Sequence, residues 1–339
     1  MTSTLSESHT QRSVLAVGYV VLDVLIHQKG IGHSAGGTAG NVAANLSYFG
    51  WASSVGALYG DDPAGDHLKA DLARAGVSPR ALMRREELST PVVIHEVKNG
   101  AHRFKFGCPE CGRKFSQFRA ISRDFAEELS EESTPDVLFL DRVSSAAVLL
   151  AKSVRDLGGL VFFEPSMPAD SPRFRELLDL AHVVKFSTER LDPKSHLLED
   201  VDAIQIYTDG VNGAFWRRPD GDWKHVSGYS ANVVDAGGAG DWTTAALLTA
   251  LPSVDPLRLL STDLTEPLKY AQAVAALSCQ VLGARGLSSA TNRDDLDERV
   301  TEVRRKPKQR HSTRTSRPTK SRRAAACSAC LARKSACDG

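Results

Sequence analysis

The chain has 339 residues, of which 42% are hydrophobic, so it can bury the core of one large α/β domain. Its net charge of +1 hides an asymmetry, because twelve Lys and Arg residues but one acid lie between Arg304 and Gly339. The remaining body is acidic, which argues against a nucleic-acid-binding fold and leaves at most the basic tail to contact nucleic acid.

The first predicted elements alternate between strands and helices, after a polar segment (1–12) that we expect to be disordered. The apolar run 14–26 predicts a buried strand. It is too short to span a bilayer and lacks a signal-peptide pattern, so we expect a cytoplasmic protein without a membrane partner. A glycine-dense turn (34–41) then leads into a helix, and a strand over 52–58 with a helix over 66–75 repeats this unit.

Two alternating segments between Pro91 and Phe106 flank an Asn-Gly pair, the strongest short signal for a β-hairpin. Phe104 and Phe106 fall on one face of the second segment, and Arg103 and Lys105 fall on the other. A hairpin inserted among strand–helix units predicts a small β lid over about residues 90–118.

Short apolar strands separated by helical stretches return at 137–140, 160–163, 182–186 and 204–207. This alternation predicts a mainly parallel central sheet covered by helices on both faces, with ligands at the carboxyl ends of its strands. Helices are expected over 239–251 and 268–282. We place the folded domain at 13–302 and a basic, cysteine-containing disordered tail at 303–339.

The segment N-V-V-D-A-G-G-A-G-D-W places glycines and an acid at the start of an apolar helix. The backbone amides of Gly238, Ala239 and Gly240 can converge there on an anion, which the helix dipole also favours. Asp241 is placed to accept a proton from a hydroxyl group in phosphoryl transfer. No Lys follows the glycines, so a Walker-type loop is excluded. The alternative is a glycine turn with a helix-capping Asp.

Two signatures resemble those of the ribokinase-like (PfkB-type) carbohydrate kinases. D-A-G-G-A-G-D (235–241) is similar to the family's D-T-x-G-A-G-D, with Ala236 in place of Thr. G-G-T-A-G-N-V-A-A-N-L-S-Y-F-G, followed by G-A-L-Y-G-D-D-P-A-G, resembles its amino-terminal signature. The resemblance runs from about residue 14 to 286. It implies a three-layer α/β/α ribokinase-like fold and a kinase that uses ATP and Mg²⁺ to phosphorylate a hydroxyl of a sugar, sugar acid or nucleoside.

The resemblance also implies roles for single residues. Asp241 matches the catalytic base, Gly238 to Gly240 match the anion hole, and Asp23 matches an acid that binds substrate hydroxyls. The positions that match further contacts are Gly36, Gly37 and Asn41 for the sugar, and Thr208, Gly210 and Gly213 in Y-T-D-G-V-N-G-A for ATP.

The element S-T-E-R departs from the family's N-x-x-E, which helps organise Mg²⁺ near the phosphates. Ser187 is the first residue of this element and is expected on the nucleotide side of the site. Arg190 occupies the position of the family's acid, and Glu189 lies one residue before that position.

Arg142 follows Asp141 at the end of the strand V-L-F-L, at the sheet edge expected to face the cleft. An arginine there could clamp an acidic or phosphorylated substrate, or it could form a surface ion pair. The substrate is therefore open among sugars, sugar acids and nucleosides.

Cys108 and Cys111, in C-P-E-C-G, have the spacing of half a tetrahedral Zn²⁺ site. The alternatives are an exposed turn with two free thiols, or a knuckle shared across a dimer. A homodimer through the lids is one expected arrangement, because many members of the resembled family pair there. The remaining ligands of an intramolecular zinc site would be His95 or His102, or the tail pair Cys327 and Cys330.

A second function class is a kinase-fold protein that has lost turnover and acts as a ligand sensor or scaffold through its basic, cysteine-rich tail. Arg190 and Ala236 favour this alternative, whereas the intact G-G-A-G-D and Asp23 disfavour it.

Overall fold

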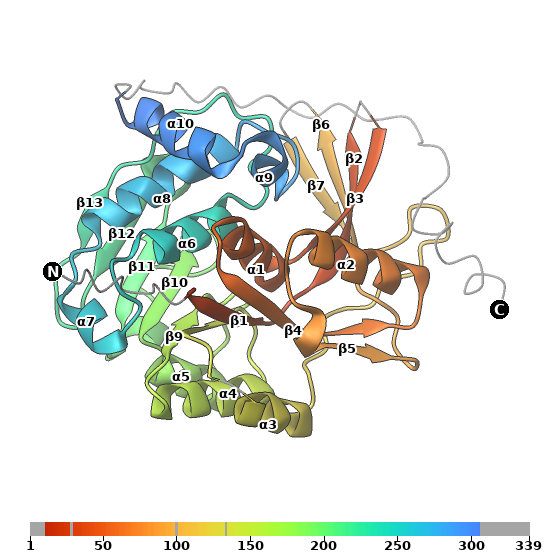
Figure 1. The fold of residues 1–339 in the computed structure, drawn as a ribbon, viewed down its shortest axis with the longest axis horizontal. Coiled ribbons are helices and arrows are strands. Elements are labelled where there is room, and N and C mark those ends of the chain that lie inside the picture. Colours follow the sequence, from red (N-terminus) through yellow and green to blue (C-terminus); the bar gives the residue numbers. More distant parts are fainter. Residues whose placement is uncertain (1–10, 28–29, 99–100, 133, 306–339) are drawn as a thin grey trace, which may run out of the picture.

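The computed structural model describes residues 11–27, 30–98, 101–132 and 134–305. Their largest feature is a nine-stranded sheet with the order β13-β12-β11-β10-β9-β8-β1-β4-β5 (Figure 1). Strands from β11 to β5 in this order pair in parallel, and β12 and β13 are antiparallel. The strands are β1 (Ser13–Val17), β4 (Ala52–Gly60), β5 (Leu82–Arg85), β8 (Val137–Leu140), β9 (Leu160–Phe163), β10 (Val183–Ser187), β11 (Ile204–Thr208), β12 (Ala214–Arg217) and β13 (Lys224–Val226).

Helices cover both faces of this sheet, which confirms the predicted α/β/α layers (Figure 1). Alternate strand residues face opposite layers: Phe139 packs in the core beneath α1, α6 and α8, and Leu138 packs in the core over α3, α4 and α5. The helices are α1 (Thr38–Tyr48), α2 (Pro63–Arg74), α3 (Arg123–Glu132), α4 (Ser145–Asp156), α5 (Pro172–Leu180), α6 (Ala239–Ala250), α7 (Pro256–Ser261), α8 (Thr265–Ser278), α9 (Gly286–Ala290) and α10 (Arg293–Arg305).

Local capping sets where several helices begin. The Asp62 side chain accepts a hydrogen bond from the Gly65 amide, and Pro63 occupies the first helical position, so α2 starts three residues before the predicted 66. Ser144 caps α4 in the same way, and Ser171 caps α5 ahead of another proline. These caps set the first residue of each helix and therefore the end of the turn that connects it to the preceding strand.

The prediction of one strand over 14–26 is wrong. The chain leaves the large sheet after β1 and enters a second sheet as β2 (Val21–His27). The break falls at Gly18, where an added Cβ would lie 1.6 Å from Asp141 Oδ1, so only a residue without a side chain can pass the end of β8. Residues on both sides of the break are buried, and hydropathy alone therefore could not show the change of sheet.

The second sheet has four strands, in the order β3-β2-β6-β7, and stands beside the large sheet (Figure 1). Its hairpin pairs β6 (Val92–Lys98) with β7 (Ala101–Lys105), as the alternation predicted, and β3 (Gly30–Gly36) pairs with β2. The Asn-Gly tip lies outside the described residues. The lid therefore also includes 21–36, which the sequence prediction left out, and a homodimer through it stays a prediction.

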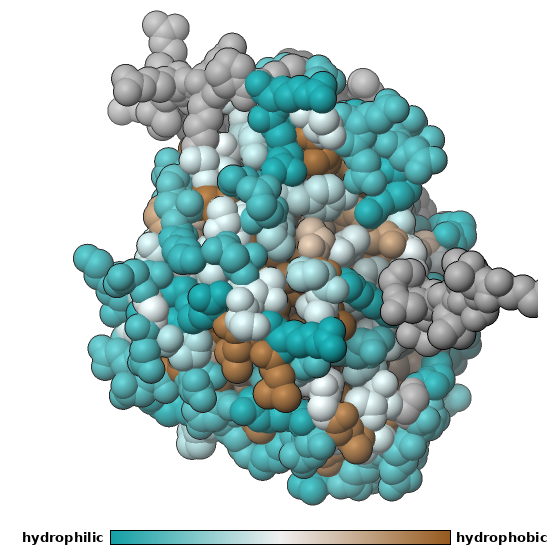
Figure 2. Space-filling view, turned by 60° about the vertical axis from the view of Figure 1, so that its left-hand side comes forward, coloured by the Kyte–Doolittle hydropathy of each residue, from teal (hydrophilic) through white to brown (hydrophobic). Residues whose placement is uncertain are grey.

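The molecular face in Figure 2 is mainly hydrophilic, with small separated hydrophobic areas. In the part of the chain that the structure describes, no helix combines the length and hydrophobicity needed to cross a membrane. The predicted disordered segment 1–12 and the basic tail 303–339 lie mostly outside the described residues.

Candidate active site

The glycine motif forms a tight turn at the amino end of α6. Gly238 has φ 79°, in the left-handed region, and an added Cβ would lie 2.5 Å from the Ala284 carbonyl oxygen. The Ala239 amide donates weakly, at 3.3 Å, to the Ala236 carbonyl, whereas the Gly240 amide has no partner among the described residues. The turn therefore presents amide hydrogens at the positive end of a twelve-residue helix.

Asp235 holds this turn from behind. Its buried carboxylate accepts hydrogen bonds from the Gly237 amide at 2.7 Å and from the Gly283 amide at 2.8 Å. One side chain thus fastens the glycine turn to the loop after α8. Position 236, where alanine replaces the threonine of the resembled signature, contributes no side-chain hydroxyl to the turn.

Asp241 lies in the first turn of α6, where Asn41 Nδ2, from α1, donates a hydrogen bond of 2.7 Å to its Oδ2. Burial raises the pKa of Asp241 to about 7, and the negative charge of Glu164 adds to this. The Asn41 hydrogen bond and the positive charges of Lys185 and Arg190 oppose the rise in pKa. A carboxyl group with this pKa can exchange a proton near neutral pH.

A buried ion pair that was not predicted from the sequence contacts the first turns of α6. Lys185 Nζ, on β10, lies 2.6 Å from Glu164 Oε1 and also donates at 3.3 Å to the Gly240 carbonyl. Thr244 Oγ1 donates to the other Glu164 oxygen at 2.6 Å. The sequence signal was present, because each charge interrupts or ends an apolar strand, in V-V-K-F and V-F-F-E.

Asp23 lies on β2 in the small sheet, opposite Ser34 of β3. Gly36 approaches it so closely that an added Cβ would lie 1.8 Å from Asp23 Oδ2, and Gly37 caps α1. Burial raises the pKa of Asp23 to about 7, Arg285 opposes the rise, and the negative charge of Asp241 adds to it. The structure thus brings the predicted hydroxyl-binding acid into electrostatic contact with the predicted base.

The predicted nucleotide-side residues lie together at the ends of two neighbouring strands. Ser187 ends β10 and is the register partner of Thr208, which ends β11. Gly210 and Gly213 form the following turn, where Gly213 has φ 103° and an added Cβ would meet the Val226 carbonyl oxygen at 2.2 Å. The two glycines therefore leave the backbone of this turn accessible on either side of residues 211 and 212, next to the ends of β10 and β11.

Arg190 is exposed on the turn after β10, and its Nη1 donates to Ser166 Oγ at 3.2 Å. The described residues contain no group of three or more His, Cys, Asp or Glu side chains able to hold a metal. Both Glu164 oxygens are already bonded. These residues do not form a magnesium cage, and Mg²⁺ would have to be held chiefly by nucleotide phosphates and water.

The predicted zinc half-site forms a compact turn in which Cys108 is buried and Cys111 is exposed. The Gly112 amide donates to the Cys108 carbonyl at 3.0 Å, and the Cys108 amide donates to the Arg113 carbonyl at 2.9 Å. His95 instead stacks on Phe104, with ring centroids 4.4 Å apart. The His102 side chain and the tail pair Cys327 and Cys330 lie outside the described part, so structural zinc stays a prediction.

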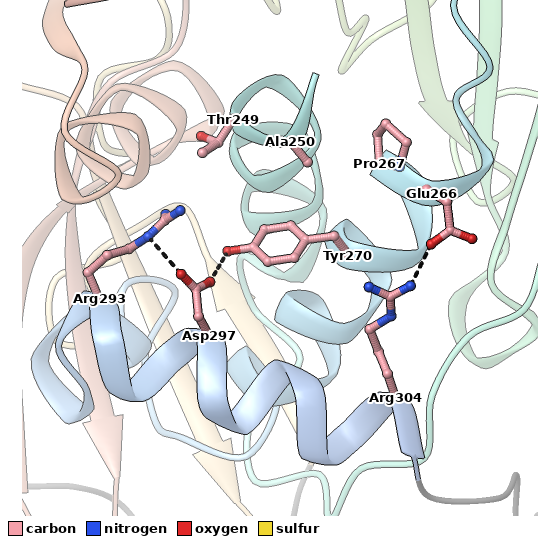
Figure 3. Close-up of a pocket in the computed structure, with 8 residues that line it drawn as sticks. All are labelled: Thr249, Ala250, Glu266, Pro267, Tyr270, Arg293, Asp297 and Arg304. Carbon is pink, nitrogen blue, oxygen red and sulfur yellow. Dashed lines mark hydrogen bonds and ion pairs between the residues drawn. The ribbon is translucent and has the colours of Figure 1, made fainter. Parts of the chain in front are cut away.

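A pocket of about 360 Å³ lies elsewhere, among α6, α8 and α10 (Figure 3). Its charged side chains pair with one another: Arg304 lies 2.6 Å from Glu266, and Arg293 lies 3.5 Å from Asp297, which also accepts a hydrogen bond from the Tyr270 hydroxyl at 2.9 Å. It contains none of the predicted site residues, and nothing in it resembles the glycine turn.

A mainly parallel sheet between helix layers, with a small β-sheet beside it and a glycine turn at its carboxyl edge, defines a ribokinase-like fold. A solved fructokinase with bound ATP from Xylella fastidiosa has this fold; it superposes with a TM-score of 0.68 at 21% identity, covering 86% of this chain and 99% of that one. The chain belongs to the pfkB family of carbohydrate kinases, whose sequence profile matches residues 11–291.

Two curated relatives cover most of the chain. A fructokinase of Escherichia coli is 28% identical over 298 residues, which are 80% of this chain and 94% of that protein. An ATP-dependent ribose-1-phosphate kinase of Halopiger xanaduensis is 26% identical over 266 residues, covering 76% and 84% respectively.

Proposed function

We propose that this chain transfers the γ-phosphoryl group of ATP to a hydroxyl of a sugar, sugar acid or nucleoside. The observation that carries the proposal is the position of Asp241: its carboxyl group lies in the first turn of α6, beside the amides of the glycine turn and in electrostatic contact with Asp23. The ATP in the similar fructokinase structure and the kinase names of both relatives support ATP as the donor.

In this reaction Asp23 would orient the acceptor by accepting hydroxyl hydrogen bonds, and Asp241 would take the proton of the attacking hydroxyl. The amides of Gly238 to Gly240 would stabilise the charge that develops on the transferring phosphoryl group. Gly36, Gly37 and Asn41 would line the sugar side, and Ser187, Thr208, Gly210 and Gly213 would line the nucleotide side. Mg²⁺, held by the phosphates, would neutralise part of their charge.

Asp241→Asn tests the proposal. The substitution keeps the shape of the side chain and removes the base, so turnover should fall by roughly 10² to 10⁴ while ATP binding is retained. ADP release should be measured with a pooled panel of sugars, sugar acids and nucleosides. An unchanged turnover in the variant would remove Asp241 from the mechanism.

The alternative, a ligand sensor or scaffold without turnover, is favoured by Arg190, which puts a cation where the resembled element has an acid. The same panel separates the two functions. If ATP binds to the wild-type protein but no acceptor is phosphorylated, the sensor function replaces the kinase proposal.

A further inference from the structure

We propose that the acceptor carries an anionic group, a phosphate or a carboxylate, and that Arg142 at the carboxyl end of β8 binds it. This inference rests on the proposed function, which leaves the acceptor open, and it adds the charge of the acceptor.

Arg142 is a preorganised cation. Its side chain is 15% exposed, and its Nη1 donates to Asp141 Oδ2 at 2.7 Å and to the Asp141 carbonyl at 3.1 Å. The guanidinium carbon lies 4.8 Å from the centroid of the Tyr19 ring and 5.8 Å from that of Phe118. Within the described residues all its hydrogen bonds come from Nη1, which leaves Nη2 and Nε to donate to a ligand.

The ion pair of Arg142 with Asp141 does form, but the group that holds Arg142 is buried and does not lie at the surface. The Asp141 side chain has no exposed surface, and its oxygens also accept from the Tyr19 amide at 2.8 Å and from Ser166 Oγ at 3.1 Å. The missing side chain of Gly18 lets this carboxylate reach Tyr19. A buried carboxylate with this many donors fixes the direction of the guanidinium.

Arg142 also lies on the side of the site that holds the acceptor. The Tyr19 carbonyl approaches Gly37 so closely that an added Cβ would lie 2.2 Å from it, while the Tyr19 ring stacks on Arg142. Burial raises the pKa of Tyr19, the negative charge of Asp23 adds to the rise, and the positive charge of Arg142 opposes it. Tyr19 therefore lies within electrostatic reach of both the hydroxyl-binding acid and the arginine. An acceptor bound by its hydroxyls to Asp23 would place another part of its carbon chain near Arg142. Because Asp23 and Asp241 are acids, a further negative charge on the acceptor is tolerated there only beside a fixed cation.

Binding measurements on the Asp241→Asn protein test the inference without turnover. Ribose, ribose 5-phosphate and ribonate should be titrated by calorimetry, with inorganic phosphate as a further probe. Hydrogen bonds to a charged group predict that at least one anionic sugar binds roughly 10- to 100-fold more tightly than ribose. Whether ribose 5-phosphate or ribonate binds more tightly shows whether the preferred anion is a phosphate or a carboxylate.

Adding Arg142→Gln should abolish this preference and leave ribose affinity within about threefold, because only the anion loses its partner. Arg142→Lys should restore part of it, and Arg175→Gln, which removes an exposed arginine of α5, should change nothing. Since Arg142→Gln leaves a buried carboxylate without its cation, the double change Asp141→Asn/Arg142→Gln should be measured too, with the same loss expected.

The inference would be overturned by equal binding of neutral and anionic sugars, or by a loss of affinity on Arg142→Gln that is the same for both. Phosphorylation of neutral acceptors that is independent of Arg142 would also overturn it while leaving the kinase proposal standing. Conversely, Arg142-dependent anion binding without turnover of any acceptor by the wild-type protein would overturn the kinase proposal and keep the anion site.

Discussion

Asp241→Asn should increase the stability of the ligand-free protein while it removes the proposed base. Burial raises the pKa of Asp241 from 3.8 to about 7. A carboxyl group whose pKa is raised by folding binds its proton more tightly in the folded state. Its contribution to stability is therefore fully present below about pH 4 and is lost as the pH rises through about 7. Asparagine does not ionise, so the variant escapes this loss.

The size of the effect follows from the shift. About three pH units at 1.36 kcal/mol each give a difference in unfolding free energy of about 4 kcal/mol at pH 8. At pH 5 the unfolded carboxyl is ionised and the folded one is not, and the same linkage gives about 2 kcal/mol. The Asn41 hydrogen bond survives in the variant, because an amide oxygen can also accept it.

Urea unfolding of the ligand-free proteins at pH 5 and pH 8 measures the difference. Asp263→Asn is the control of opposite sign, because hydrogen bonds that Thr265 donates to Asp263 lower the pKa of this carboxyl group to about 2. The Asp263 contribution is present above about pH 4, so this variant should be destabilised equally at both pH values. A gain for Asp241→Asn that does not grow between pH 5 and pH 8, or a destabilisation at pH 8, would refute the burial argument.

Two further substitutions test the surroundings of Asp241. Arg190→Gln removes a positive charge that lowers the pKa of Asp241. The apparent pKa of the acid limb of the kcat/KM profile, expected near 7, should therefore rise by less than about one unit, and a fall in this pKa contradicts the arrangement. Lys185→Met leaves Glu164 buried without its cation and should lower the unfolding free energy in urea by about 3–5 kcal/mol, and Lys185→Met/Glu164→Leu should recover most of it. A single variant as stable as the wild type would show that the pair is not coupled.

The layers of the fold could be predicted because local patterns determine them. Short apolar runs such as 137–140 and 160–163 are strands buried on both faces, and the Asn-Gly pair marks the hairpin. The small sheet could only be predicted in part. β3 reads G-I-G-H-S-A-G, whose glycines and polar residues indicate a turn, and only its pairing with β2 makes it a strand.

The glycine turn and Asp241 could also be predicted, since one contiguous segment contains them. That Glu164, Lys185 and Asn41 tune the pKa of Asp241 could not be predicted, because these residues come from three separate elements that only the folded chain brings together. Likewise the sequence shows Asp141 beside Arg142, but not that Ser166 and the Tyr19 amide hold that carboxylate.

The break at Gly18 divides the proposed chemistry between two pieces of the fold. Asp23 rides on the small sheet, whereas Asp241 belongs to the main body, and the negative charge of Asp241 raises the pKa of Asp23. When both carboxylates are ionised they repel, and an acceptor polyol that donates one hydroxyl to each would offset this repulsion, so the acceptor itself should favour the approach of the two pieces.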